Sequence, residues 1–167
     1  MFHLVLLPMR PHKQIASTAY KIQMKNTFLL LALIAISSYA TSQNLHIYGG
    51  ADHTEYLGCL NCSRFDSKSI WNAFGDYGSS FSHTSIWNDL NNYGDPNNPL
   101  SPWNTLATKA PKIMDDTGKF QGYFTANTSV KERSLSRLSI ELIKNYKEIP
   151  EDLGRWYTKL VVDYSKL

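Results

Sequence analysis

Two cysteines are the residues of this chain whose spacing points most directly to a chemistry. Cys59 and Cys62 form a C-x-x-C pair, the spacing of redox dithiols and of one half of a four-cysteine zinc site. No βαβ pattern surrounds the pair and no second pair completes a zinc site, so a short-range disulfide or two packed thiols is the expected state. Export would favour the disulfide, although the short span limits its stabilising effect.

Histidines supply the remaining candidates for metal binding or acid–base chemistry. His46 and His53 precede the cysteines and could join them in a Cys₂His₂ cluster, while His83 lies between Asp76 and Asp89. A histidine beside a carboxylate can serve as an acid–base pair. The chain contains no G-x-S-x-G elbow, phosphate loop or H-E-x-x-H motif. The sequence therefore predicts no metal site and no cofactor, and it identifies no catalytic residue.

An aromatic repeat dominates the middle of the chain. The tetrapeptide Ser-Ile-Trp-Asn at residues 69–72 recurs at 85–88 and, with Pro in place of Ile, at 101–104. The two steps are equal and define a 16-residue repeat, which other positions also follow. These correspondences are Phe65 with Phe81, Phe74 with Leu90 and Leu106, and Tyr77-Gly78 with Tyr93-Gly94.

Three tryptophans occupy one position of this repeat, and two interpretations of them are open. Trp71, Trp87 and Trp103 could form a stacking platform for sugars or wall polymer, with neighbouring Asn and Asp side chains as hydrogen-bond partners. Alternatively, each Trp anchors its unit in the core, because units so poor in Leu and Val have little else to bury. We favour the second interpretation, and exposure of the indoles separates the two.

Elements on both sides of the repeat indicate the fold class. Residues 112–114 and 120–125 flank Asp115-Asp116-Thr117-Gly118, a pattern typical of a β-hairpin, and 56–61 is expected to be a short strand. Ser, Asn, Asp and Gly favour turns in the repeat, where each unit should hold one short element and two turns with Trp and Phe packed inward. A Ser129 to Glu132 capping box and an apolar stripe predict a helix, and Pro150 opens a second.

We therefore expect an α+β fold, with a small β-hairpin element, a loop-rich layer of 16-residue repeats and a C-terminal pair of amphipathic helices. The expected organisation is a leader at 1–42, a β and loop region at 43–127, and a helical tail at 128–167 packed on the same domain. The apolar stripe of the first helix is Leu135, Leu138, Leu142, Tyr146 and Ile149.

The leader is predicted from charge and hydropathy. Residues 1–42 contain four basic and no acidic residues, and the apolar run at 28–36 is too short to span a bilayer of about 30 Å. Small residues follow, so cleavage is expected before Thr41 or Gln43. Met24-Lys25-Asn26 is a sufficient start for such a peptide, which predicts that residues 1–23 lie upstream of the true start. The alternative is an uncleaved membrane anchor.

Charge excludes one class of partner once the leader is set aside. All 14 acidic residues but only 13 of the 17 basic ones follow position 42. Between residues 65 and 104 the only Lys or Arg is Lys68, against four aspartates, so a phosphate backbone would be repelled there. No nucleic-acid partner is predicted.

The run from Tyr56 to Asn127 resembles repeat segments of uncharacterised exported bacterial proteins. The resemblance covers under half the chain and implies no activity. It rests on Leu57-Gly58-Cys59-Leu60, Phe65 to Ser69, the three Ser-x-Trp-Asn units, Tyr77-Gly78-Ser79 and Asp115 to Gly118. The chain departs from that pattern where Asp95-Pro96, and not Ser, follows Tyr93-Gly94.

The function that fits these observations is a non-enzymatic binding or accessory module of the cell envelope, secreted or periplasmic. Its partner would be cell-wall polysaccharide or an envelope protein, with no membrane span after signal cleavage. Two alternatives remain. One is a secreted hydrolase whose active site is assembled from residues that cannot be connected from the sequence, and the other is a purely structural spacer.

Overall fold

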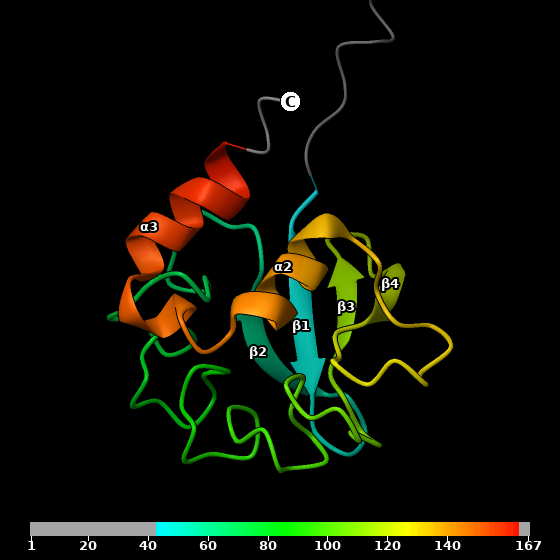
Figure 1. Ribbon diagram of the computed structural model, residues 1–167. Coiled ribbons are helices and arrows are strands. Elements are labelled where there is room, and N and C mark those ends of the chain that lie inside the picture. Colours follow the sequence, from blue (N-terminus) through cyan, green and yellow to red (C-terminus); the bar gives the residue numbers. More distant parts are fainter. Residues whose placement is uncertain (1–42, 164–167) are drawn as a thin grey trace, which may run out of the picture. The chain divides into compact units, whose positions relative to one another are not determined.

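The computed structural model describes residues 43–163. The predicted leader at 1–42, with its cleavage site and start, and the last four residues of the tail lie outside these described residues. Within this range the fold is α+β, as expected (Figure 1). A four-stranded antiparallel sheet is joined to a long segment of turns and to two C-terminal helices.

The sheet brings together strands from both sides of the turn segment. Its order is β2-β1-β3-β4, with every neighbouring pair antiparallel. The hairpin predicted around Asp115 to Gly118 is confirmed as β3 and β4. An unexpected strand, β1, pairs with both β2 and β3. The four strands are β1 Leu45–Gly49, β2 Glu55–Cys59, β3 Lys112–Asp115 and β4 Phe120–Tyr123.

The two faces of the sheet differ because side chains alternate along a strand. Ile47 of β1 pairs with Ile113 of β3, and both are buried on the inner face. His46, Tyr48 and the β3 residue Met114 are half-buried on the opposite face, where His46 pairs with Met114. The inner face therefore belongs to the core, and the outer face presents rings.

No regular helix or strand forms between residues 63 and 107; the chain runs instead through consecutive turns of about three residues. Backbone N–H groups of Asp66, Ser69 and Asn72 donate to carbonyls three residues earlier, and the pattern continues at most steps to Ala107. The expected single short element per unit is wrong. A regular element does not form because Ser, Asn and Asp side chains accept hydrogen bonds from nearby backbone N–H groups, and these bonds favour turns over a helix or a strand.

Side chains at the first residue of these turns repeat one hydrogen bond. The Ser69 hydroxyl accepts from the Trp71 N–H, and the Asn72 side-chain oxygen accepts from the Phe74 N–H. The bonds at Ser85 and Asn88 are the same, as are those at Ser101 and Asn104. One extra residue enters at Gly78 and at Gly94, so that five three-residue turns and one insertion make up each 16-residue step.

The first of the two C-terminal helices begins later in the chain than the predicted capping box at Ser129. Helix α2 is Arg137–Asn145, and Ser136, not Ser129, caps it by accepting from the Ser139 N–H. The box at Ser129 is not used because the chain beyond it pairs with β4. Helix α3 is Leu153–Tyr157, preceded by a 3-10 turn at Ile149–Glu151 and continued by a π-helical turn at Thr158–Val162.

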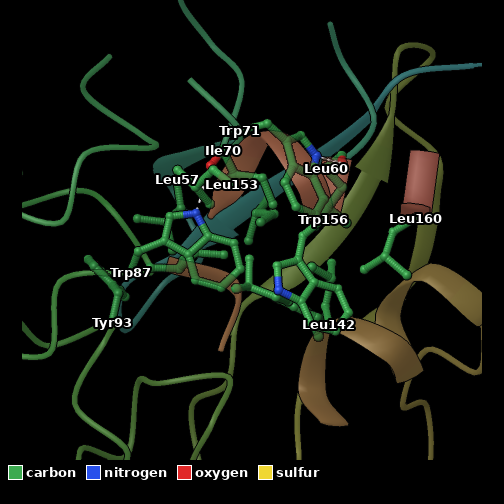
Figure 2. Close-up of a cluster of buried hydrophobic side chains, with 14 of the residues drawn as sticks. Leu57, Leu60, Ile70, Trp71, Trp87, Tyr93, Leu142, Leu153, Trp156 and Leu160 are labelled. Atoms are coloured by element: carbon green, nitrogen blue, oxygen red, sulfur yellow. Dashed lines mark hydrogen bonds between the residues drawn. The ribbon is translucent and has the colours of Figure 1, made fainter. Parts of the chain in front are cut away.

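One hydrophobic core joins the sheet, the turns and the helices. Figure 2 shows Trp71 and Trp87 of the turn segment packed among Leu57 of β2 and Leu142 and Trp156 of the helices. Its largest fully buried side chains are Phe124, Ile47, Leu57, Leu60, Ile70, Ile86, Ile113, Leu142 and Ile149. The turn segment, although it lacks regular structure, thus contributes to the same core as the sheet.

Candidate functional site

The three repeat tryptophans lie inside the protein. Trp71, Trp87 and Trp103 are exposed by only 2%, 6% and 3%. Rings of Trp87 and Trp103 stack with centroids 5.5 Å apart, and the Trp103 ring also stacks on Tyr146 of the tail at 5.0 Å. A sugar-stacking platform needs free ring faces, and these faces are covered by protein. The residues proposed as ligand-binding therefore act as core anchors in this structure.

Each indole also uses its only hydrogen-bond donor internally. The Trp87 Nε1–H donates to the Ile70 carbonyl at 2.6 Å, and the Trp103 Nε1–H donates to the Ile86 carbonyl at 2.8 Å. The Trp71 Nε1–H donates in the same way to Leu60, just after β2 (Figure 2). Each of these three indoles thus ties its turn to an earlier stretch of the chain and satisfies a buried carbonyl.

The three phenylalanines of the turn segment and two of its three leucines point outward, contrary to the expectation that Phe would pack inward with Trp. Their exposed fractions lie between 78% and 100%. Each Trp and the exposed residue three positions after it hold the same place in two consecutive turns, yet the first is buried and the second lies in solvent. We call these five side chains the ridge: Phe65, Phe74, Phe81, Leu90 and Leu106.

The ridge follows two positions of the 16-residue step. Phe74, Leu90 and Leu106 each come three residues after a tryptophan, and Phe65 and Phe81 occupy the other position. Phe65 and Phe74, one from each position, line the same hollow and therefore lie near each other. Large apolar side chains left in solvent at repeated positions are candidates for an interaction surface.

A second feature is an open groove of about 670 Å³ over the outer face of the sheet. Aromatic rings form its floor, with Tyr56 at the centre. The Tyr56 ring lies 5.3 Å from that of Tyr48, 5.0 Å from that of Tyr77 and 5.7 Å from that of His46. Lys68 and Lys112 also line the groove.

His46 joins two polar groups at this groove. Its Nε2 lies 2.9 Å from Asp116 Oδ1, and its Nδ1 lies 2.9 Å from the Tyr56 hydroxyl. With the ring proton on Nε2, the imidazole donates to the carboxylate and accepts from the phenol. The hydrogen bond from His46 lowers the pKa of Asp116. Burial, together with Tyr48 and Tyr77, raises the pKa of Tyr56, which holds this phenol in its donating form.

The other candidates from sequence fall into different places. Cys59 and Cys62 are joined in a disulfide at the junction of β2 and the turn segment. His53 lines the groove, but its Nε2–H donates to the Ala110 carbonyl. His83 is exposed, and no hydrogen bond links it to Asp76 or Asp89 within residues 43–163. Among the same residues no group of three or more His, Cys, Asp or Glu side chains is placed to hold a metal ion.

Comparisons with protein-family models, with curated proteins and with solved structures find no match to this chain. In the part of the chain that the structure describes, no helix has the length and apolar character needed to cross a bilayer.

Proposed function

We propose that this protein is an exported, non-enzymatic binding module of the cell envelope, and that the ridge docks it onto a protein partner. The observation that carries the proposal is the near-complete exposure of five large apolar side chains at two positions of the 16-residue step. Burying such groups against a partner is favourable because it removes apolar surface from water.

A protein partner suits the ridge better than a polysaccharide. Phe74 is replaced by Leu90 and Leu106 at equivalent positions. Stacking on a sugar needs the flat face of a ring, which leucine lacks, whereas leucine and phenylalanine serve equally well in an apolar protein contact. The choice of residues at this position therefore favours hydrophobic docking over stacking.

The size of the ridge is appropriate for a stable contact. At about 150 Å² for each large side chain, five of them offer on the order of 700 Å², close to the ~800 Å² that each partner contributes to a standard interface. Phe65 and Phe74 also border a hollow of about 360 Å³ that Pro150 and Leu153 line from the helical side. A protruding partner side chain could enter this hollow.

Charge around the ridge indicates the sign of the partner. Asp66, Asp76 and Asp89 are exposed and Asp95 is half-buried, against two cations, Lys68 and Arg64, whose guanidinium lies 4.8 Å over the Phe65 ring. A partner surface with Lys or Arg around an apolar centre would complement this pattern and gain association rate as well as specificity.

A sedimentation experiment with the native envelope fraction tests the proposal. The full chain should co-sediment with the fraction, and the triple variant Phe74→Ser, Leu90→Ser, Leu106→Ser should lose at least about nine-tenths of this binding. The control is Leu135→Ser, because Leu135 is also exposed but lies outside the ridge. It should bind as the parent does.

Pretreatment of the fraction separates the two partner classes. Protease digestion of the envelope fraction should abolish binding. Digestion of the wall polysaccharide should not abolish it, and the chain should then be recovered together with its protein partner in the soluble fraction. Binding that survives protease but not polysaccharide digestion would contradict the protein partner. Equal binding by the parent and the triple variant would contradict the role of the ridge.

A further inference from the structure

The groove on the outer sheet face is built by distant parts of the chain and is separate from the ridge. Strand β1 supplies His46 and Tyr48, β2 supplies Tyr56, and β3 supplies Lys112. Tyr77 comes from the turn segment and covers one side. Such a convergence of rings and charged groups on a concave surface is typical of ligand sites.

Gly58 allows the turn segment to approach the sheet closely enough to form the groove. This residue has φ +112°, and a Cβ there would lie 2.8 Å from both Ile70 Cγ2 and Tyr77 Cβ. A bulge precedes it, because Ile47 pairs with Gly58 while Tyr48 pairs with Tyr56. The bulge and the glycine together set Tyr77 against Tyr56, which completes the aromatic floor.

The carboxylates at the groove are already satisfied by the protein. Asp115 accepts hydrogen bonds from Thr117, Lys119 and Gln121 within its own hairpin. Asp116 accepts from His46 and from the Asn44 N–H, both at 2.9 Å. Neither acidic group therefore needs a cation or a donor from outside.

The ammonium groups and two phenols, by contrast, are open. Among residues 43–163, neither Lys68 nor Lys112 has a carboxylate within ion-pair distance. The hydroxyls of Tyr48 and Tyr77 have no hydrogen-bond partner in the same range, whereas that of Tyr56 is engaged by His46. The groups of the groove that have no partner are therefore two ammonium groups and two phenol hydroxyls, which lie around the faces of the aromatic rings.

We propose that this groove is a second binding site and that it takes an acidic saccharide unit, one or two sugar rings bearing a carboxylate or a phosphate. The C–H faces of a sugar pack on tyrosine rings, its hydroxyls can bond the free phenols, and its anionic group can pair with Lys68 or Lys112. The volume falls within the ~300–1,000 Å³ of typical ligand sites.

A nucleic-acid strand fits the groove less well, although it too combines rings with negative charge. Asp66 and Asp76 lie beside Lys68 and Tyr77 in the chain, so a continued phosphate backbone would meet negative charge there. Two cations also suffice for one anionic group but not for several successive phosphates. A short oligonucleotide is therefore included as a competing ligand in the test.

Isothermal titration calorimetry of the full chain tests this proposal with defined probes. The probes are digalacturonate, its neutral dimethyl ester, glucose 6-phosphate with glucose as its neutral match, and a deoxythymidine tetranucleotide. We expect saturable binding of digalacturonate or of glucose 6-phosphate, with a dissociation constant at least about tenfold lower than that of the matched neutral sugar. The two acidic probes distinguish carboxylate from phosphate as the anionic group.

Matched variants identify the site. Lys112→Met keeps the aliphatic stem and should weaken binding of the acidic probe about tenfold, whereas Lys144→Met on α2 should not change it. The ridge triple variant should bind the probe normally, which separates this site from the docking proposal. Absence of saturable binding for both acidic probes, equal binding of acid and neutral match, preference for the tetranucleotide, or an unaffected Lys112→Met variant would each overturn the proposal.

Discussion

The ridge and the groove differ in the sequence distance between the residues that build them. The ridge rises from consecutive turns whose hydrogen bonds join residues two or three positions apart. The groove needs β1, β2, β3 and the loop of Tyr77, which come from distant parts of the chain, as the His46–Asp116 contact illustrates. Because the local hydrogen bonds recur at each step of the repeat, the same positions are exposed in successive steps. Pairing between distant segments instead brings together a set of neighbours that occurs only once.

Equivalent tyrosines show how the sheet breaks the regularity of the turns. Tyr77 and Tyr93 precede the two inserted glycines and lie one repeat step apart. Tyr77 is half-buried and packs edge-on against Tyr56, while Tyr93 is buried and its hydroxyl donates to the Glu55 carboxylate. Burial and this hydrogen bond raise the pKa of Tyr93. The same local position thus has two fates, because the sheet contacts only part of the turn segment.

The largest expected effect comes from the indole that ties two turns together. Trp87→Ala should destabilise the fold by about 3–5 kcal/mol, because it leaves a cavity beside Trp71 and Trp103 and an unpaired Ile70 carbonyl. Denaturant unfolding measures the loss. Trp87→Phe, which keeps a ring but not the N–H donor, should cost clearly less. A loss below about 1 kcal/mol for the alanine variant would show that the turn segment does not depend on its buried rings.

Reduction of the disulfide should have the next largest effect, since this bond lies where the sheet meets the turns. Closing the short loop between Cys59 and Cys62 accounts for about 2 kcal/mol in the chain-entropy description. Unfolding curves with and without a reductant measure it, and the Cys59→Ser, Cys62→Ser double variant, insensitive to the reductant, is the control. An unchanged midpoint on reduction would mean that packing alone holds this junction.

On the groove side, Asp115 should give an effect confined to acid pH. Hydrogen bonds, first that from the Thr117 side chain, lower its pKa to about 2 from an ordinary value of 3.8. Because the pKa is lower in the folded state, the contribution to stability is present above about pH 4 and is lost as the pH falls toward 2. Asp115→Asn should flatten the stability profile in that window. Thermal unfolding between pH 2 and 5 measures it, and an unaltered profile would contradict the assignment.

The smallest effect on stability is expected three residues after the largest. Leu90→Ser should change the free energy of unfolding by no more than about 0.5 kcal/mol, because Leu90 is 92% exposed. Denaturant unfolding beside Trp87→Ala makes the contrast direct. A loss as large as that of a buried residue would mean that the ridge packs against the protein itself and is not free for a partner.

Several features could be predicted because their causes are local. The Asp115 to Gly118 turn with flanking apolar residues predicted the β3–β4 hairpin, and the tail was expected to be helical. The spacing of Trp, Ser and Asn marked the positions that carry the indole and turn-closing hydrogen bonds. In each case the residues that make the bond lie close together in the sequence or recur at a fixed step.

Features that depend on distant contacts were missed. The short strand β1 gave no clear periodic signal, and the Ser129 box failed because its following residues pair with β4. His46 was considered beside the cysteines, although its partners in the structure are Tyr56 and Asp116. The groove has no continuous motif, so no window of sequence could have identified it.

The sequence by itself determined the regular spacing of aromatics, the turn-forming chemistry between them, and the presence of a hairpin and a helical tail. Only the tertiary structure decided that Trp faces the core while the ridge residues of the same units face solvent. The physical reason is that hydropathy would bury Phe and Leu at least as readily as Trp, whereas their direction depends on which side of each turn the sheet and helices cover.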